Sequence, residues 1–403
     1  MPIVGCFYEN DTMTKHFFRT GVAGLLTVAA LAGCGKTPEP EPDPTPQPDN
    51  RISLTPLSQM TLKEKVGQLF TIPPEDLVPD ASGYLTQGSA TMKETFKDYP
   101  CGGIILFAGN IKNPSQIKEF NSFLHGLGNY PIICVDEEGG RVARIAKNSN
   151  FNVPTYKSME EVGKTGDPQN AYNAGDRIGT YLLNYSFDID FAPVSDVNTN
   201  PENVVIGDRA FGSDPQLVAN MASQFLKGLQ NNKVEGCLKH FPGHGDTSTD
   251  SHYGYAESLK TWDQLVNCEM IPFKKGIESG ARMIMTAHIC LPNVAGAQMP
   301  STLSPTILQD KLRGELGYQG VIITDSMGMG AITKEYSAGE AAVLAIEAGV
   351  DMMLMPENYK EAFQAVLDAV ASGRLTEKMI DERATRVLEL KKSLLRSRGL
   401  LKE

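Results

Sequence analysis

Eight short apolar segments, spread between residues 66 and 355, constrain the fold of this chain more than any other feature of its sequence. They are 66–72, 102–107, 132–136, 189–193, 236–240, 282–288, 320–325 and 351–355. Nearly continuous apolar runs are typical of parallel strands covered on both faces, and the intervals leave room for a helix in each crossover. We therefore expect an α/β fold, a (β/α)8 barrel of the TIM type, with an open doubly wound sheet as the alternative.

The two ends of this pattern are less regular than its middle. Segment 66–72 is the weakest strand prediction, because residues 62–69 also have the pattern of an amphipathic helix. Residues 376–395 predict a long charged helix, which we expect to pack on the barrel exterior through one apolar face. That face consists of Ile380, Ala384, Val387 and Leu388. Since a barrel of this type can occupy more than 250 residues, we expect residues 51–403 to form one domain with no second domain after this helix.

Polar residues follow the predicted strands at the point where most of them end. Because the active sites of such barrels lie at the carboxyl ends of the strands, these residues should form a ring around one site. Its expected members are Asp136, Asp196, Lys239 with His240, His288, Asp325 and Glu357. A net charge of −11 and the lack of a basic stripe argue against a nucleic-acid partner, which requires cations to displace counterions.

Residues 239–252 read Lys-His-Phe-Pro-Gly-His-Gly-Asp-Thr-Ser-Thr-Asp-Ser-His and contain three of the six histidines in the chain. Proline and glycines exclude a helix here, so the segment is a shaped loop directly after a strand. A metal site is an alternative interpretation, because zinc needs three or four such ligands. Its ligands would be His240, His244, Asp246, Asp250 and His252. The ammonium of Lys239 beside the cation disfavours it, and we expect neither a metal nor another cofactor.

The N-terminal residues have the pattern of an export signal. Basic residues precede an apolar run at 22–31, which is shorter than the roughly 20 residues needed to span a bilayer. The tetrapeptide 31–34, Leu-Ala-Gly-Cys, resembles the bacterial lipobox, in which the cysteine is acylated. We therefore expect residues 1–33 to be a signal peptide, Cys34 to carry the lipid, and the proline-rich residues 34–50 to be a tether. The protein would then be an exported, membrane-anchored lipoprotein on the periplasmic or cell-surface side.

Five further cysteines lie in the body of the chain, and an odd number cannot all pair. They are Cys101, Cys134, Cys237, Cys268 and Cys290. Most of them lie in or beside apolar runs, so we expect mainly buried small side chains.

The loop 239–252, together with the segments 135–142, 207–212 and 323–327, resembles the single-domain β-N-acetylhexosaminidases of glycoside hydrolase family 3. The resemblance runs from about residue 55 to the C-terminus. It implies cleavage with retention, with Asp325 as the nucleophile and His252 as the proton donor, oriented by Asp250. A histidine suits the donor role because a carboxylate partner selects its tautomer and stabilises its charged form.

The same resemblance implies which residues hold the terminal sugar, and these are Asp136, Arg144, Arg209, Lys239 and His240. A surface salt bridge is the alternative interpretation of Arg144 and Arg209, and Arg141 fits a structural role. Glu137 stands where relatives commonly carry Gln, so we expect an added charge near the site that bears on specificity.

The resemblance therefore implies an exo-acting β-N-acetylglucosaminidase, which we expect to act on peptidoglycan or chitin-type fragments. A family 3 β-glucosidase or broader glycosidase is the first alternative, although larger relatives place their proton donor in a second domain that we do not expect here. A lipoprotein that binds a glycan without cleaving it is the second alternative.

Overall fold

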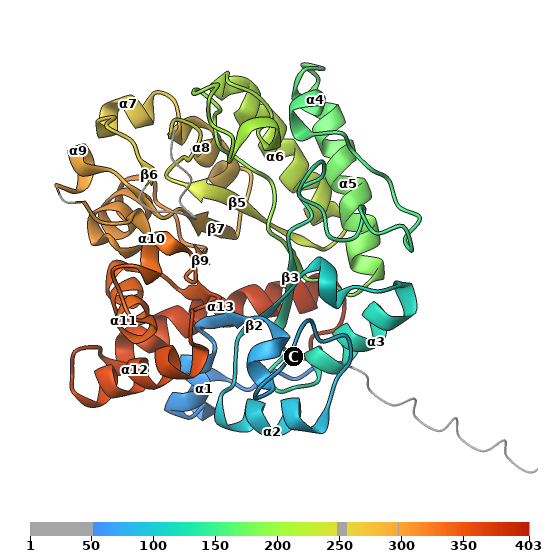
Figure 1. Cartoon of the computed structure of the whole chain (residues 1–403), viewed down its shortest axis with the longest axis vertical. Helices are drawn as coiled ribbons and strands as arrows, with labels where there is room; N and C mark the ends of the chain where they lie inside the picture. Colours follow the sequence, from blue (N-terminus) through green and yellow to red (C-terminus); the bar gives the residue numbers. More distant parts are fainter. Residues whose placement is uncertain (1–50, 248–255, 297, 403) are drawn as a thin grey trace, which may run out of the picture. The chain divides into compact units, whose positions relative to one another are not determined.

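The structure, a computed structural model, describes residues 51–247, 256–296 and 298–402. Its centre is a closed barrel of parallel strands in the order β1-β2-β3-β4-β5-β7-β9-β10 (Figure 1). The strands are β1 (Phe70–Ile72), β2 (Gly103–Leu106), β3 (Ile132–Val135), β4 (Ile189–Asp190), β5 (Glu235–Phe241), β7 (Met283–Thr286), β9 (Val321–Ser326) and β10 (Met352–Leu354). Each predicted segment overlaps one of these strands, and the closed order of the strands confirms the barrel and excludes the open sheet.

Alternate residues along each strand face opposite sides of the barrel wall. The interior cluster contains Ile132 and Cys134 of β3, Cys237 of β5, and Val321 and Ile323 of β9. Their neighbours along the same strands pack instead into the larger cluster beneath the surrounding helices. This alternation explains why nearly every strand position is apolar, and it directs the next interior-facing position of each strand toward the mouth of the barrel.

Helices surround the barrel, and most of them begin where the sequence provides an N-cap. The side chains of Ser89, Asn113, Asp167, Asp214 and Ser337 each accept a hydrogen bond from a backbone amide of the first turn. The surrounding helices are α2 (Ala90–Asp98), α3 (Pro114–His125), α5 (Pro168–Asn184), α6 (Pro215–Asn231), α8 (Met270–Glu278), the π-helix η6 (Thr306–Glu315), α11 (Ala338–Ala348) and α12 (Tyr359–Ala371).

The first strand is shorter than the sequence pattern predicts. Helix α1 (Leu62–Gly67) occupies the first part of segment 66–72, and the strand prediction is wrong there. Thr61 and Glu64 form a capping box, in which each side chain accepts a hydrogen bond from the backbone amide of the other residue. This cap fixes the start of the helix, so the chain becomes extended only at Phe70.

The last helix, α13 (Glu377–Ser397), lies across the amino-terminal end of the barrel instead of along its side (Figure 1). Its side chains contact segments that precede strands: Arg386 pairs with Asp351, and Lys391 donates to the Asn129 carbonyl. Three of its apolar residues belong to the interior cluster, namely Val387, Leu390 and Leu394. The helix therefore closes the base of the barrel, and only the carboxyl end remains open for a site.

Shorter elements lie around this open end. They are α4 (Met159–Gly163), α7 (Trp262–Val266), α9 (Pro292–Ala295), α10 (Gly330–Thr333) and the two-stranded sheet of β6 (Ala256–Glu257) and β8 (Ile289–Cys290). The five body cysteines are free, and four of them are buried. Within the described ranges, no helix has both the length and the apolar character needed to cross a membrane.

Candidate active site

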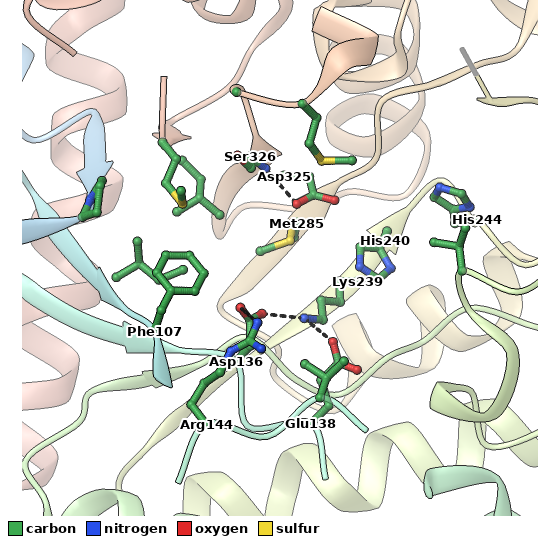
Figure 2. Close-up of a pocket in the computed structure, with 18 of the residues that line it drawn as sticks. Phe107, Asp136, Glu138, Arg144, Lys239, His240, His244, Met285, Asp325 and Ser326 are labelled. Carbon is green, nitrogen blue, oxygen red and sulfur yellow. Dashed lines mark hydrogen bonds and ion pairs between the residues drawn. The ribbon is translucent and has the colours of Figure 1, made fainter. Parts of the chain in front are cut away.

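A cavity of about 670 Å³ lies at the carboxyl ends of the strands. All five residues expected to hold the terminal sugar line it, and so does Asp325. Figure 2 labels Asp136, Arg144, Lys239, His240 and Asp325 among the lining residues. Asp136, Lys239 and Asp325 each continue the interior-facing alternation of their strands, which places them in the top layer of the barrel. The apolar part of the lining includes Phe107, Met285, Leu354 and Met355.

Two carboxylates and three cations form one network on the side of the cavity formed by β3 and β5. Lys239 Nζ lies 2.9 Å from Asp136 Oδ1 and 2.6 Å from Glu138 Oε1. Arg209 binds Glu138 through two parallel hydrogen bonds of 2.7 and 2.8 Å. Arg144 donates to Asp136 over 3.2 Å. Figure 2 shows the contacts of Lys239 with Asp136 and Glu138. Such a network presents fixed donors and acceptors to a polar ligand.

These groups keep their charges although they are buried. Burial by itself would raise the pKa of Glu138, but Arg209 and Lys239 outweigh it and hold that pKa well below its usual range. Burial would lower the pKa of Lys239, yet Asp136 and Glu138 raise it above its ordinary value. Neither group titrates near neutral pH, so both can orient hydroxyl groups without exchanging protons with them.

The buried carboxylate of Asp196 holds His240 in place. His240 Nδ1 lies 2.7 Å from Asp196 Oδ2, and its backbone amide donates to the same carboxylate. The amide of His244 donates to Asp196 Oδ1 over 2.7 Å. Because Nδ1 faces Asp196, the Nε2 atom of His240 faces the cavity, where it lies 3.3 Å from Arg209 Nη2. Asp196 therefore orients His240 and does not itself line the cavity.

Asp325 is the second-last residue of β9 and points into the cavity (Figure 2). Its Oδ1 accepts a hydrogen bond of 2.7 Å from the Ser326 amide. Burial would raise its pKa, but His240, His288 and this amide outweigh the effect, so the pKa lies below its usual value. His288 lies outside the lining and contacts the Ser326 carbonyl, 2.9 Å from its Nε2. An ionised carboxylate at this position is suited to attack an electrophilic carbon.

Glu137 lies beside the site but does not line the cavity. Its carboxylate faces away and accepts hydrogen bonds from the amides of Arg144, Ile145 and Ala146 and from the Tyr181 hydroxyl. Burial raises its pKa. Glu137 instead fixes the loop that carries Arg144.

Two other residues differ from their expected places. Asp196 and His288 were expected in the ring of polar groups, but both are buried outside the lining of the cavity. Arg141 has a structural contact, because its guanidinium donates to the carbonyls of Val204, Val205 and Ile206. Sequence reasoning missed Glu138, although the alternation from Asp136 places it on the same side of the chain.

The loop that follows β5 is described only in part. Asp250 and His252, the expected orienting residue and proton donor, lie outside the described residues. Before them, Asp246 binds Lys260 Nζ, Ser258 Oγ and Thr199 Oγ1. In the part of the chain that the structure describes, no three His, Cys, Asp or Glu side chains lie close enough together to hold a metal ion.

Comparisons with known proteins identify one family of glycoside hydrolases. The model of the glycosyl hydrolase family 3 N-terminal domain matches residues 61–390. Beta-hexosaminidase A of Pseudoalteromonas piscicida is 32% identical over 351 residues, which are 80% of this chain and 58% of that protein. Beta-hexosaminidase of Stenotrophomonas maltophilia (strain K279a) is 34% identical over 291 residues, 70% of this chain and 84% of that protein.

Among solved structures, a glycoside hydrolase family 3 beta-N-acetylglucosaminidase from Paenibacillus sp. str. FPU-7 is similar, with a TM-score of 0.77 and 38% identity. The match covers 83% of this chain and 63% of that one. This chain thus spans less than two thirds of the length of the Pseudoalteromonas and Paenibacillus proteins.

Proposed function

The chain belongs to glycosyl hydrolase family 3, and from that premise we propose that it is a retaining exo-β-N-acetylhexosaminidase. It releases terminal β-linked N-acetylglucosamine from peptidoglycan or chitin-type fragments. The observation that carries the proposal is Asp325, an ionised carboxylate that faces a cavity whose opposite wall is a network of fixed charges. The activities for which these relatives are named agree with this proposal.

In the proposed reaction, Asp325 attacks the anomeric carbon of the terminal sugar. The bond from this carbon to the leaving oxygen breaks, and a covalent glycosyl-Asp325 intermediate forms. Water then attacks the same carbon and releases the carboxylate. Two inversions at one carbon return the β configuration.

Proton transfer is assigned to His252, with Asp250 as its orienting partner, on the strength of the family resemblance alone. His252 donates a proton to the leaving oxygen in the first step and accepts one from water in the second. Asp136, Arg144, Arg209, Lys239 and His240 hold the hydroxyl and acetamido groups of the sugar. Their donors and acceptors are already oriented by one another, so little ordering accompanies binding.

The site of action is proposed from the N-terminal sequence. Cys34 carries the lipid after removal of residues 1–33, and residues 34–50 tether the catalytic domain to a bacterial membrane on its exported side. An enzyme held there meets glycan fragments outside the cytoplasm.

The proposal is tested with a panel of aryl glycosides that share one leaving group. The β-N-acetylglucosaminide should be cleaved at least a hundredfold faster than the β-glucoside, because a buried site built to bind a group rejects analogues that lack it. Equal rates would favour a broad glycosidase. Binding of N-acetylglucosamine oligomers without turnover of any glycoside would favour a glycan-binding lipoprotein.

A further inference from the structure

A second hollow of about 450 Å³ adjoins the catalytic cavity. The two share three lining residues, Pro73, Phe107 and Met355, so they are continuous across the ends of β1, β2 and β10. The second hollow is largely apolar and its outer wall includes Tyr84. Nothing in the proposed chemistry of the first sugar uses this region.

Tyr84 has an unusual setting for a large aromatic residue. It is 59% exposed, one of four large hydrophobic residues on the described surface. Its ring nevertheless packs closely against Gly109. A Cβ atom added to this glycine would lie only 1.9 Å from Tyr84 Cδ2, so no side chain larger than hydrogen fits there without displacing the ring. One part of the ring therefore lies directly on the Gly109 backbone, and the remainder is open to solvent beside the hollow.

The loop that carries Tyr84 is held by partly buried hydrogen bonds. Glu75 Oε1 accepts hydrogen bonds from the Leu85 amide, at 2.6 Å, and from Asn110 Nδ2, at 2.7 Å. Asn110, which is fully buried, also donates to the Leu85 carbonyl and accepts from the Phe107 amide. Tyr84 and Phe107 are thus attached to the same polar anchor, so the aromatic surface is preorganised.

From this geometry we propose that Tyr84 and Phe107 form a distal subsite that stacks against a further pyranose ring of the oligosaccharide. The proposal rests on the proposed function, since an exo-acting enzyme places every additional ring on the leaving-group side of the cleaved bond. An exposed aromatic face, held in place before binding, offers contact area to the C–H face of a sugar at low entropic cost.

Charged groups of both signs lie between the two hollows. Asp76 and Glu357 line the catalytic cavity, and the Arg144 guanidinium lies 5.6 Å from the centre of the Phe107 ring. The subsite is therefore assigned to a pyranose ring through its aromatic surface, without a preference for the charge of that ring.

The test compares kcat/KM for an aryl β-N-acetylglucosaminide and for the N-acetylglucosamine trisaccharide. Tyr84→Ala should lower kcat/KM for the trisaccharide roughly three- to tenfold more than for the aryl substrate, the range expected for one aromatic contact. Gly109→Ala, which displaces the ring without removing it, should reproduce this ratio. Tyr84→Phe should retain the wild-type ratio, and so should Leu400→Ala, an exposed apolar residue at the base of the barrel.

Equal losses on the two substrates, or no loss in either variant, would overturn the subsite. Failure of the wild-type protein to cleave the aryl substrate would instead refute the proposed function, so the two failures are distinguishable.

Discussion

Glu138 should be indispensable for the charge network of the cavity although it is not expected to touch the reacting atoms. Its side chain is 1% exposed, and its carboxylate is shared by Arg209 and Lys239. Glu138→Gln keeps the shape and one acceptor oxygen but leaves two buried cations with less compensation. Truncating one partner of a buried charge pair costs about 2–5 kcal/mol. The retained oxygen places the expected value at the lower end, about 2 kcal/mol, which corresponds to a loss of roughly 30-fold in kcat/KM.

Glu94→Gln provides a control with the same substitution, because the Glu94 side chain is 71% exposed and pairs with Lys97 on the surface of α2. It changes no contact in the cavity, and we expect kcat/KM to remain within about threefold of wild type, the level of a surface change. Both variants are assayed on the aryl β-N-acetylglucosaminide, and their unfolding is followed with denaturant. A Glu138→Gln protein as active as Glu94→Gln would refute the reasoning.

The pH dependence of stability gives a second readout of the same substitution. The pKa of Glu138 in the folded protein is depressed, so its stabilisation is present above the unfolded-state pKa, about 4.3, and is lost only as pH falls through the folded value. The difference in unfolding free energy between wild type and Glu138→Gln should therefore be constant between about pH 6 and pH 8 and should shrink in acid.

Three further predictions concern other parts of the chain. His252→Ala should release a burst of dinitrophenol and then turn over slowly, with azide accelerating the second step, because a good leaving group departs without protonation; normal steady-state turnover would assign the proton transfer elsewhere. Lys391 is fully buried, and burial lowers its pKa to about 7. The free energy of unfolding should therefore rise with pH between pH 7 and about pH 10, as the lysine of the unfolded chain loses its proton. Lys391→Met should remove this rise, and an unchanged pH profile would contradict it. The native protein should partition into membranes and Cys34→Ser should not, because Cys34 is the residue expected to carry the lipid. One acyl chain gives only weak binding, so we expect more than one chain. An unmodified Cys34 in the mass spectrum would exclude the anchor.

The sequence predicted the barrel because its strands are buried on both faces. A short continuous apolar run such as 132–136 is typical of a strand in a parallel sheet, and the ends of eight such strands then locate Asp136, Lys239 and Asp325 at one site. The first strand was predicted too long, although Thr61 and Glu64 have the spacing of a capping box that marks a helix start. Local capping determined that boundary, not hydrophobicity.

The orientations of Glu137 and Glu138 could not be read from residue type, because adjacent residues of one kind have different roles. Their difference arises from the extended path after β3, which directs alternate side chains to opposite sides. The proposed role of Tyr84 could not be predicted from the sequence either. An exposed tyrosine in a loop carries no sequence signal, and only its packing on Gly109 shows that its ring is fixed.

The central claim is that Asp325 forms a covalent intermediate, and the stereochemistry of the first product tests it most directly. Wild-type protein is mixed with the aryl β-N-acetylglucosaminide in an NMR tube, and the anomeric proton of released N-acetylglucosamine is followed before mutarotation is complete. Two displacements at one carbon predict that the β anomer appears first and the α anomer grows in later. Initial release of the α anomer would contradict the nucleophilic role of Asp325.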